Sequence, residues 1–432
     1  MNDEKTFEVK EVNKTMTNGR FDFKNSASGI LGRSEVTYFN PKNGKYQTQN
    51  YLTMQDVVVP VILKRSKSGE LMFAMQYESN PSANGILLEL PECPFFREKK
   101  DVYSNGDVTE CIEERLESLG LEMEGFRYLD SSETAVNQSI TDQLMKVVSV
   151  YAEEKEEIED NGLIWFPISS LEDYLSDKKA NENELERSSL QTKYALRLFY
   201  NKYKEEIKKW PPTEFKYDEK MINENGENWE KQKTIMEHKY RFGLQLAEKK
   251  GKENPEIQDF GQVSEYGTSK NSVECLVTKK DGKRIKIGLS KQQRSPHINR
   301  EGVSEYFYEE VGGMLEPTED YETALKREVP EETGIQVKNG KIVHLSNPII
   351  LSKGTQECSA FYLYEMADND VQGEKKLDQQ ECIENIEWFY LDEIDLEKLH
   401  APLPTKYAIL KAREYYKELE KIKSESFDLE ER

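Results

Sequence analysis

Residues 313–335 read GMLEPTEDYETALKREVPEETGI, and their spacing is the most informative pattern in the chain. Glu328, Glu331 and Glu332 stand at positions i, i+3 and i+4, so a helix would place them on one side. Carboxylates this close together repel one another unless a divalent cation binds them, and their hard oxygens suit Mg²⁺ or Mn²⁺. The segment therefore predicts a helix that carries a metal site. The alternative is an acidic helix face that only meets solvent.

Further residues of the same segment support the metal site. Gly313 and Gly334 mark backbone turns before and after the helix, and Arg327 and Glu319 can supply supporting salt bridges. Pro330 departs from this pattern because it removes a backbone N–H inside the helix, at a cost of about 3 kcal/mol. A bend at this proline would shift the last two carboxylates relative to the first.

Short sequence words recur in the same order in both halves of the chain, which predicts a duplicated domain. The matching pairs are 192–195 with 405–408 (both Thr-Lys-Tyr-Ala), 165–166 with 388–389 (both Trp-Phe), and 119–121 with 333–335. Each half also opens with two strand-like runs, at 57–65 and 71–77 in the first and at 273–280 and 284–290 in the second. Chance matches would have to reproduce this shared order as well.

The expected organisation has five parts. They are an N-terminal extension with a β-hairpin at 1–50, a first copy at 51–205, a helical linker at 206–270, a second copy at 271–425 and a frayed tail at 426–432. The hairpin is indicated by Asn43-Gly44, a strong turn signal. The linker helix is indicated by apolar residues from Trp229 to Ala247 at spacings that fit one helical face.

The composition excludes several classes of protein. The 432 residues carry a net charge of −22, which repels nucleic-acid phosphates and anionic membranes. There is no apolar stretch near 18 residues, and the N-terminal residues lack the apolar core of a signal peptide. The five cysteines are scattered without a CxxC pair. We therefore expect a cytoplasmic protein that binds neither nucleic acid nor membranes.

The spacing within residues 313–335 resembles the Nudix box of the Nudix hydrolases. The defining positions are filled by Gly313, Glu319, Arg327, Glu328, Glu331, Glu332, Gly334 and Ile335. The resemblance implies an α/β (α+β) fold with two Nudix-type α/β/α sandwich domains in tandem, of which the second is catalytic. It also implies that Glu328, Glu331 and Glu332, with Gly312, bind Mg²⁺ or Mn²⁺, and that Arg327 belongs to the catalytic machinery.

Three shorter elements resemble the ADP-ribose pyrophosphatases among the Nudix hydrolases. They are Gln-Arg-Ser-Pro at 293–296, Glu-Glu-Val-Gly-Gly at 309–313 and Ser-Lys-Gly-Thr-Gln-Glu at 352–357, although Gln293, Glu310 and Val311 depart from that pattern. The resemblance implies hydrolysis of a nucleoside diphosphate linked to another moiety, first of all ADP-ribose or an ADP-sugar, to AMP and a sugar phosphate. The alternatives are a dinucleotide or nucleoside triphosphate substrate, or a nucleotide-sugar-binding regulator with little turnover.

Further roles follow from the same resemblance. Glu381, at the end of a long polar stretch expected to form a lid, is the preferred general base, and Glu357 is expected to bind the metal or the attacking water. Arg294 is the expected cation for a phosphate or for the terminal ribose.

The first copy lacks most of the residues that this chemistry needs. Cys93 takes the place of the first glycine, and Glu78 stands where an arginine is expected. The Arg-Glu pair of the box becomes Glu113-Glu114, and its Glu-Glu pair becomes Glu117-Ser118. Because the fold landmarks remain without the chemistry, we expect an intramolecular pseudo-dimer. In it the first copy replaces the partner subunit of a homodimer. The alternative is an inert or substrate-sensing first domain.

Overall fold

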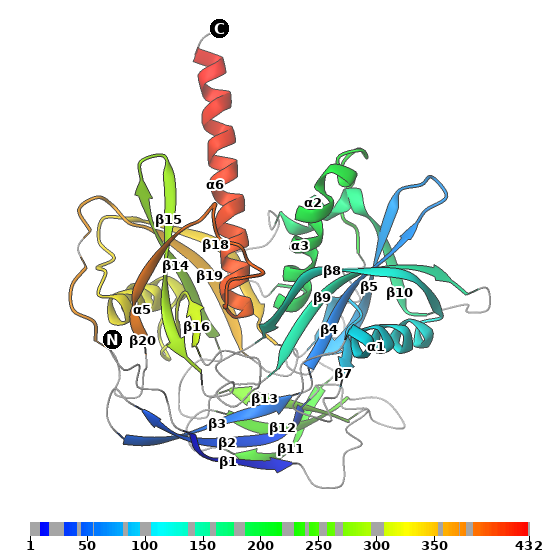
Figure 1. Ribbon diagram of the computed structural model, residues 1–432, viewed down its shortest axis with the longest axis horizontal. Coiled ribbons are helices and arrows are strands. Elements are labelled where there is room, and N and C mark those ends of the chain that lie inside the picture. The colour runs from blue at the N-terminus through cyan, green and yellow to red at the C-terminus, as the bar shows by residue number, and fades with distance from the viewer. Residues whose placement is uncertain are drawn as a thin grey trace.

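In the part of the chain that the structure describes, the fold is mixed α/β, with two seven-stranded sheets and two three-stranded sheets (Figure 1). The computed structural model describes residues 9–16, 30–40, 45–54, 56–80, 85–95, 105–136, 143–155, 161–176, 186–217, 229–237, 242–249, 257–263, 271–294, 306–352, 357–370, 372–376 and 383–430. None of the helices within these ranges is long and apolar enough to cross a membrane.

The first seven-stranded sheet has the order β10-β5-β4-β9-β8, with β6 paired to β5 and β7 paired to β4. Its elements are β4 (Asp56–Arg65), β5 (Leu71–Asn80), β6 (Gly85–Glu89), β7 (Cys93–Phe95), α1 (Asn105–Ser118), β8 (Leu121–Ala135), β9 (Leu144–Glu154), β10 (Leu163–Pro167), the 3₁₀ turn η2 (Ile168–Ser170), α2 (Leu171–Leu175) and α3 (Leu190–Ile207). We call this part the first unit.

The second seven-stranded sheet has the order β16-β15-β14-β19-β18, with β17 paired to β14 and β20 paired to β15. Its elements are β14 (Asn271–Asp281), β15 (Arg284–Gln293), β16 (Tyr306–Glu309), β17 (Val311–Met314), α5 (Tyr321–Thr333), β18 (Lys341–Ile350), β19 (Cys358–Glu365), β20 (Ile383–Tyr390) and α6 (Leu403–Glu430). This second unit repeats the first in its connections, including one parallel pair, β4 with β9 and β14 with β19. The agreement is what a duplicated unit predicts.

A three-stranded antiparallel sheet precedes each unit, and the second of these sheets corrects the sequence prediction. The N-terminal sheet contains β1 (Val9–Met16), β2 (Ile30–Asn40) and β3 (Lys45–Met54), so the expected hairpin is present with Asn40 opposite Lys45. The region 206–270 was expected to be a helical linker, but it contains β11 (Trp229–Glu237), β12 (Phe242–Lys249) and β13 (Ile257–Val263).

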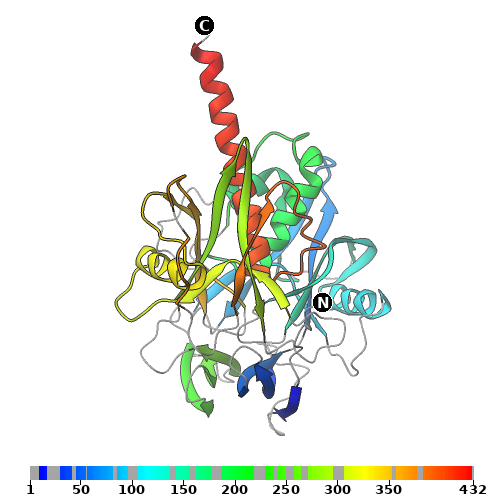
Figure 2. The same ribbon diagram turned by 60° about the vertical axis from the view of Figure 1, so that its left-hand side comes forward.

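The helical prediction was wrong because the same sequence also satisfies the two-residue period of a strand. Phe242, Leu244 and Leu246 alternate with other residues along β12. The repeat is therefore longer than expected, since both units begin with a small sheet. The two small sheets lie on the same side of the molecule, and β2 contacts β13 (Figures 1 and 2). The expected tail is also different, because α6 continues to Glu430.

The two units share one hydrophobic core. Alternate residues of β4 face opposite sides, so Val57, Val59 and Val61 join a central cluster, whereas Val58 and Ile62 join the cluster beneath α1. The central cluster contains residues of α3 and α6 and of both large sheets. Helices α3 and α6 contact each other between the sheets, and α1 and α5 cover the outer faces (Figure 1). The shared cluster makes the two units one packed body.

Polar groups buried between the units are paired across the boundary. Arg197 of α3 forms an ion pair with Glu414 of α6. Lys406 of α6 lies 3.4 Å from Asp130 of β8. The backbone N–H of Glu186 donates to the carbonyl of Pro348 at 2.7 Å. Such pairing lets charged groups be buried at the boundary without a large desolvation penalty.

Phe307 provides a direct test of this packing. It lies on β16 of the second unit, is 1% exposed and clusters with Ala135 and Leu144 of the first unit. We expect Phe307→Ala to lower the free energy of unfolding by about 3–5 kcal/mol, because it opens a cavity between the units. Urea unfolding measures this change. The control is Ile422→Ala, since Ile422 is 55% exposed. Equal small effects of both substitutions would contradict the shared core.

Candidate active site

Helix α5 forms where the sequence predicts it, and both of its ends are capped. Asp320 precedes the helix, and its carboxylate accepts a 2.7 Å hydrogen bond from the backbone N–H of Thr323. Gly334 ends the helix with φ of 76°, a left-handed conformation that favours glycine, and its N–H donates to the carbonyl of Pro330. The helix is continuous through Pro330, so the proline does not break it.

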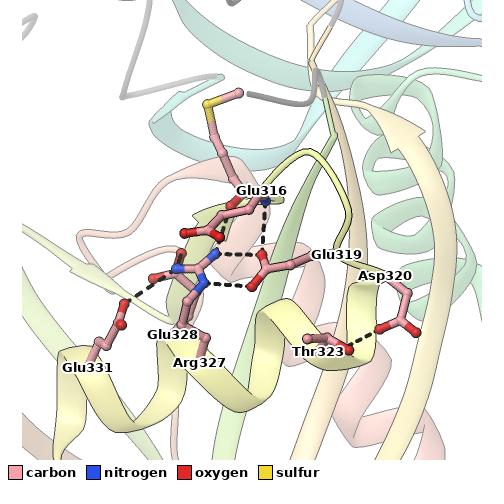
Figure 3. A network of polar contacts seen from close by, with 8 residues as sticks. Glu316, Glu319, Asp320, Thr323, Arg327, Glu328 and Glu331 are labelled. Atoms are coloured by element: carbon pink, nitrogen blue, oxygen red, sulfur yellow. Dashed lines mark hydrogen bonds and ion pairs between the residues drawn. The ribbon is translucent and has the colours of Figure 1, made fainter. Parts of the chain in front are cut away.

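Arg327 is the centre of a polar network on α5 (Figure 3). Its guanidinium donates twice to Glu319, each at 2.9 Å, and once to the carbonyl of Met314 at 3.0 Å. The same group donates to Glu328 at 2.5 Å and to Glu331 at 3.3 Å. Hydrogen bonds from Arg327 hold the pKa of Glu319 below its ordinary value, and Glu319 and Glu328 raise the pKa of Arg327. The network thus fixes two of the three carboxylates predicted as metal ligands.

Two glycines of β17 let these carboxylates approach the sheet. A Cβ atom at Gly313 would lie 1.9 Å from a carboxylate oxygen of Glu328. A Cβ atom at Gly312 would lie 2.1 Å from a carboxylate oxygen of Glu274 on β14. A side chain at either position would displace the neighbouring carboxylate, so glycine allows this close approach to the sheet.

Buried carboxylates from several elements gather beside α5. They are Glu309 (2% exposed), Glu310 (4%), Glu332 (5%) and Glu357 (7%), together with the partly buried Glu274. Burial, followed by the charges of Glu310 and Glu357, raises the pKa of Glu274 well above its ordinary value. Burial also raises the pKa of Glu310 to about 7. We call these five residues the carboxylate group.

Arg294 lies at the carboxylate group. It donates from Nε to both carboxylate oxygens of Glu309, at 2.9 and 3.1 Å, and also from Nη2. Burial alone would lower the pKa of Arg294, but the charge and hydrogen bonds of Glu309, with contributions from Glu332 and Glu274, raise it above its ordinary value. The structure therefore brings Arg294 near Glu309, Glu332 and Glu274, and the charge of Glu357 acts on Glu274.

The donor chemistry of this region fits a hard divalent cation. Glu309, Glu332 and Glu274 all act on the single guanidinium of Arg294, so carboxylate oxygens outnumber the cation in this region. Within the ranges that the structure describes, however, no three carboxylate, imidazole or thiol groups converge on one point. Arg327 lies instead between Glu328 and Glu331. Glu328, Glu331, Glu332 and the backbone of Gly312 remain the predicted ligands.

Sequence reasoning missed part of the site. Glu274 and Glu309 were not singled out, although a lone glutamate in the apolar run Val273–Val277 is a signal of a buried functional carboxylate. Thr405, which donates to Glu310 from the first turn of α6, was noticed only as part of the repeat. Glu381, the preferred general base, lies outside the described residues.

The corresponding part of the first unit differs in chemistry. Cys93 on β7 pairs with Val58, as Gly313 on β17 pairs with Val273, so the cysteine stands at the glycine position. Glu113, Glu114 and Glu117 are all exposed on α1, whereas Glu328 and Glu332 of α5 are largely buried. These glutamates cannot face a site under the helix.

The close approach of the Glu328 carboxylate to Gly313 can be tested with Gly313→Ala. We expect this substitution to displace Glu328 and to lower the thermal unfolding temperature, because the new methyl group would overlap a carboxylate that Arg327 holds in place. The matched control is Gly125→Ala on β8, where a Cβ would meet no atom within 4 Å. Differential scanning calorimetry compares the two. Equal unfolding temperatures for both variants would show that Glu328 does not lie against Gly313.

In the comparisons with known proteins, one family model matches the second unit. Residues 268–408 match the family model described as NUDIX domain, and this range holds all of α5 and the carboxylate group. A solved structure described as "Crystal structure of ADP compounds hydrolase" is 14% identical, with a TM-score of 0.32, over 46% of this chain and 95% of that chain. This likeness is too slight to bear on function. No curated protein matches the sequence. Residues 268–408 are thus similar to a NUDIX domain, which agrees with the box identified in the sequence.

Proposed function

We propose that the second unit hydrolyses the diphosphate of a nucleoside diphosphate linked to another moiety, with ADP-ribose or an ADP-sugar as the first candidate. The products would be AMP and a sugar phosphate. The observation that carries this proposal is the complete Nudix box on α5, held against the Gly312-Gly313 backbone beside the carboxylate group. The ADP-ribose assignment rests on the three short sequence elements around the box.

Different side chains would bind the metal ion and the substrate in such a reaction. A bound Mg²⁺ or Mn²⁺ would neutralise the diphosphate and the charge that develops on its oxygens. Glu328, Glu331, Glu332 and the backbone of Gly312 would hold the ion, and Arg327 orients the first two of these carboxylates. Arg294 supplies the positive charge nearest the buried carboxylates, where it can bind a phosphate or a ribose hydroxyl.

Two glutamates are proposed for the attacking water. Glu357 is 7% exposed, and its charge acts on Glu274, so it belongs to the carboxylate group and suits a metal or water ligand. Glu381 precedes β20 and is proposed as the general base.

We further propose that the first unit takes the place of a partner subunit in an intramolecular pseudo-dimer. The shared core and the ion pairs between the units support this proposal. Gln143 of the first unit also contacts Ser352, the first residue of the element that contains Glu357, at 3.5 Å. The first unit therefore reaches a segment that belongs to the site.

A nucleotide-sugar-binding regulator is the second candidate. It is favoured by Arg327, which lies between Glu328 and Glu331 where a catalytic ion would bind. A regulator of this kind would bind the ligand with little turnover.

A substrate panel with Glu332→Gln tests the enzyme. We expect the wild-type protein with Mg²⁺ to release AMP from ADP-ribose, and the variant to lose on the order of 100-fold or more of this activity, because a buried carboxylate ligand becomes neutral. Glu420→Gln, at an exposed position of α6, is the control. Chromatographic detection of AMP gives the rate. Binding of ADP-ribose by the wild type without any turnover would favour the regulator.

The pseudo-dimer is tested by dividing the chain between the units. We expect residues 229–432 alone to aggregate or to self-associate with low activity, because the residues of α6 that belong to the central cluster lose their cover. Addition of residues 1–217 should restore a one-to-one complex and its activity, as followed by light scattering and AMP release. A stable and fully active monomer of residues 229–432 would refute the pseudo-dimer.

A further inference from the structure

A buried lysine connects the two units next to the candidate site. Lys406 of α6 is 1% exposed, and its ammonium lies 3.4 Å from Asp130, 2.6 Å from Ser132 and 2.9 Å from Thr134. All three acceptors belong to β8 of the first unit. An ammonium has three protons to donate, so these three groups can take all of them. Asp130 is the carboxylate that offsets the burial of this positive charge.

The residue before this lysine contacts the carboxylate group. Thr405 is fully buried in the first turn of α6 and donates its hydroxyl proton to Glu310. The charge of Glu310 in turn acts on Glu274, whose carboxylate lies against Gly312. Two consecutive residues of one helical turn therefore hold the first unit on one side and the carboxylate group on the other.

The same Thr-Lys pair recurs at 192–193 in α3 of the first unit. Lys193 forms its ion pair with Glu186 of its own unit at 3.0 Å, with both side chains buried. Thr192 donates to Glu89, which is fully buried at the end of β6. The Tyr194 hydroxyl donates a hydrogen bond to Asp130, whereas the Tyr407 hydroxyl is hydrogen-bonded to the uncharged Ser346. Lys406, which belongs to the same unit as the intact box, pairs with a carboxylate of the other unit.

We propose that Asp130 of the first unit is a positioning residue for the site in the second unit. It holds Lys406, and with it the first turn of α6, so that Thr405 keeps Glu310 in place within the carboxylate group. The inference rests on the proposed function, because it assigns to the first unit a specific influence on that same site. Asp130 touches neither substrate nor metal in this account and acts through Lys406 and Thr405.

A double-mutant cycle tests this connection. The variants are Asp130→Asn, Thr405→Val and their combination, each measured for kcat and KM with ADP-ribose and for Mn²⁺ affinity by electron paramagnetic resonance. We expect each single variant to lower kcat about tenfold and to weaken Mn²⁺ binding, with little change in KM. Because both act through one path, the double variant should be no worse than Thr405→Val alone.

The pseudo-equivalent pair in the first unit supplies matched controls. Glu186→Gln and Thr192→Val disturb a similarly buried lysine pair and threonine, so they should lower the unfolding temperature as Asp130→Asn and Thr405→Val do. We expect kcat and Mn²⁺ affinity to stay within twofold of wild type in both controls. This contrast separates a positioning role from a general loss of stability.

Several outcomes would overturn the inference. Unchanged kcat and Mn²⁺ affinity in Asp130→Asn would do so, and so would fully additive losses in the double variant or equal losses in the controls. If Asp130→Asn does not fold, Ser132→Ala removes the 2.6 Å hydrogen bond while keeping the charge pair, and should show the same losses in smaller measure. A wild-type protein without turnover refutes the proposed function instead, and the Mn²⁺ affinities still test the connection.

Discussion

The packing of α3 against α6 between the two large sheets is the constraint on which the rest of the structure depends. One face of each sheet is covered by an outer helix, and the other face is covered in the core that the two units share. The two inner helices and the opposite sheet supply that cover. The first unit thus contributes its inner face to the shared core.

The second constraint is charge. A chain with a net charge of −22 can bind a diphosphate only where positive charge is concentrated, and the candidate site concentrates negative charge instead. The carboxylate group, in which Arg294 pairs with Glu309, is therefore understandable as a site for a divalent ion that inverts the local field. Burial raises the pKa values of Glu274 and Glu310, which means that it disfavours their ionised forms. A divalent ion nearby would favour these ionised forms again.

Local sequence patterns predicted the elements around the site, because each of these patterns is contained within a short stretch of neighbouring residues. The helix over the box, its glycine ends and the salt bridges of Arg327 all follow from spacing within 313–335. The strands at the start of each half were predicted for the same reason. The sheet at 229–263 was not, because its apolar residues fit a helical period as well as an alternating one. Sequence also could not reveal the link from Asp130 to Lys406, since it joins residues far apart in the chain through tertiary packing alone.

The central claim is that the second unit holds a catalytic divalent ion and the first does not. The most direct measurement is anomalous X-ray scattering from crystals of the full chain with Mn²⁺ and a non-hydrolysable ADP-ribose analogue. The account predicts a manganese peak beside Glu328, Glu331 and Glu332, with Arg327 moved away from Glu328, and no peak under α1. Bound analogue without manganese at these glutamates, or manganese in the first unit, would contradict it.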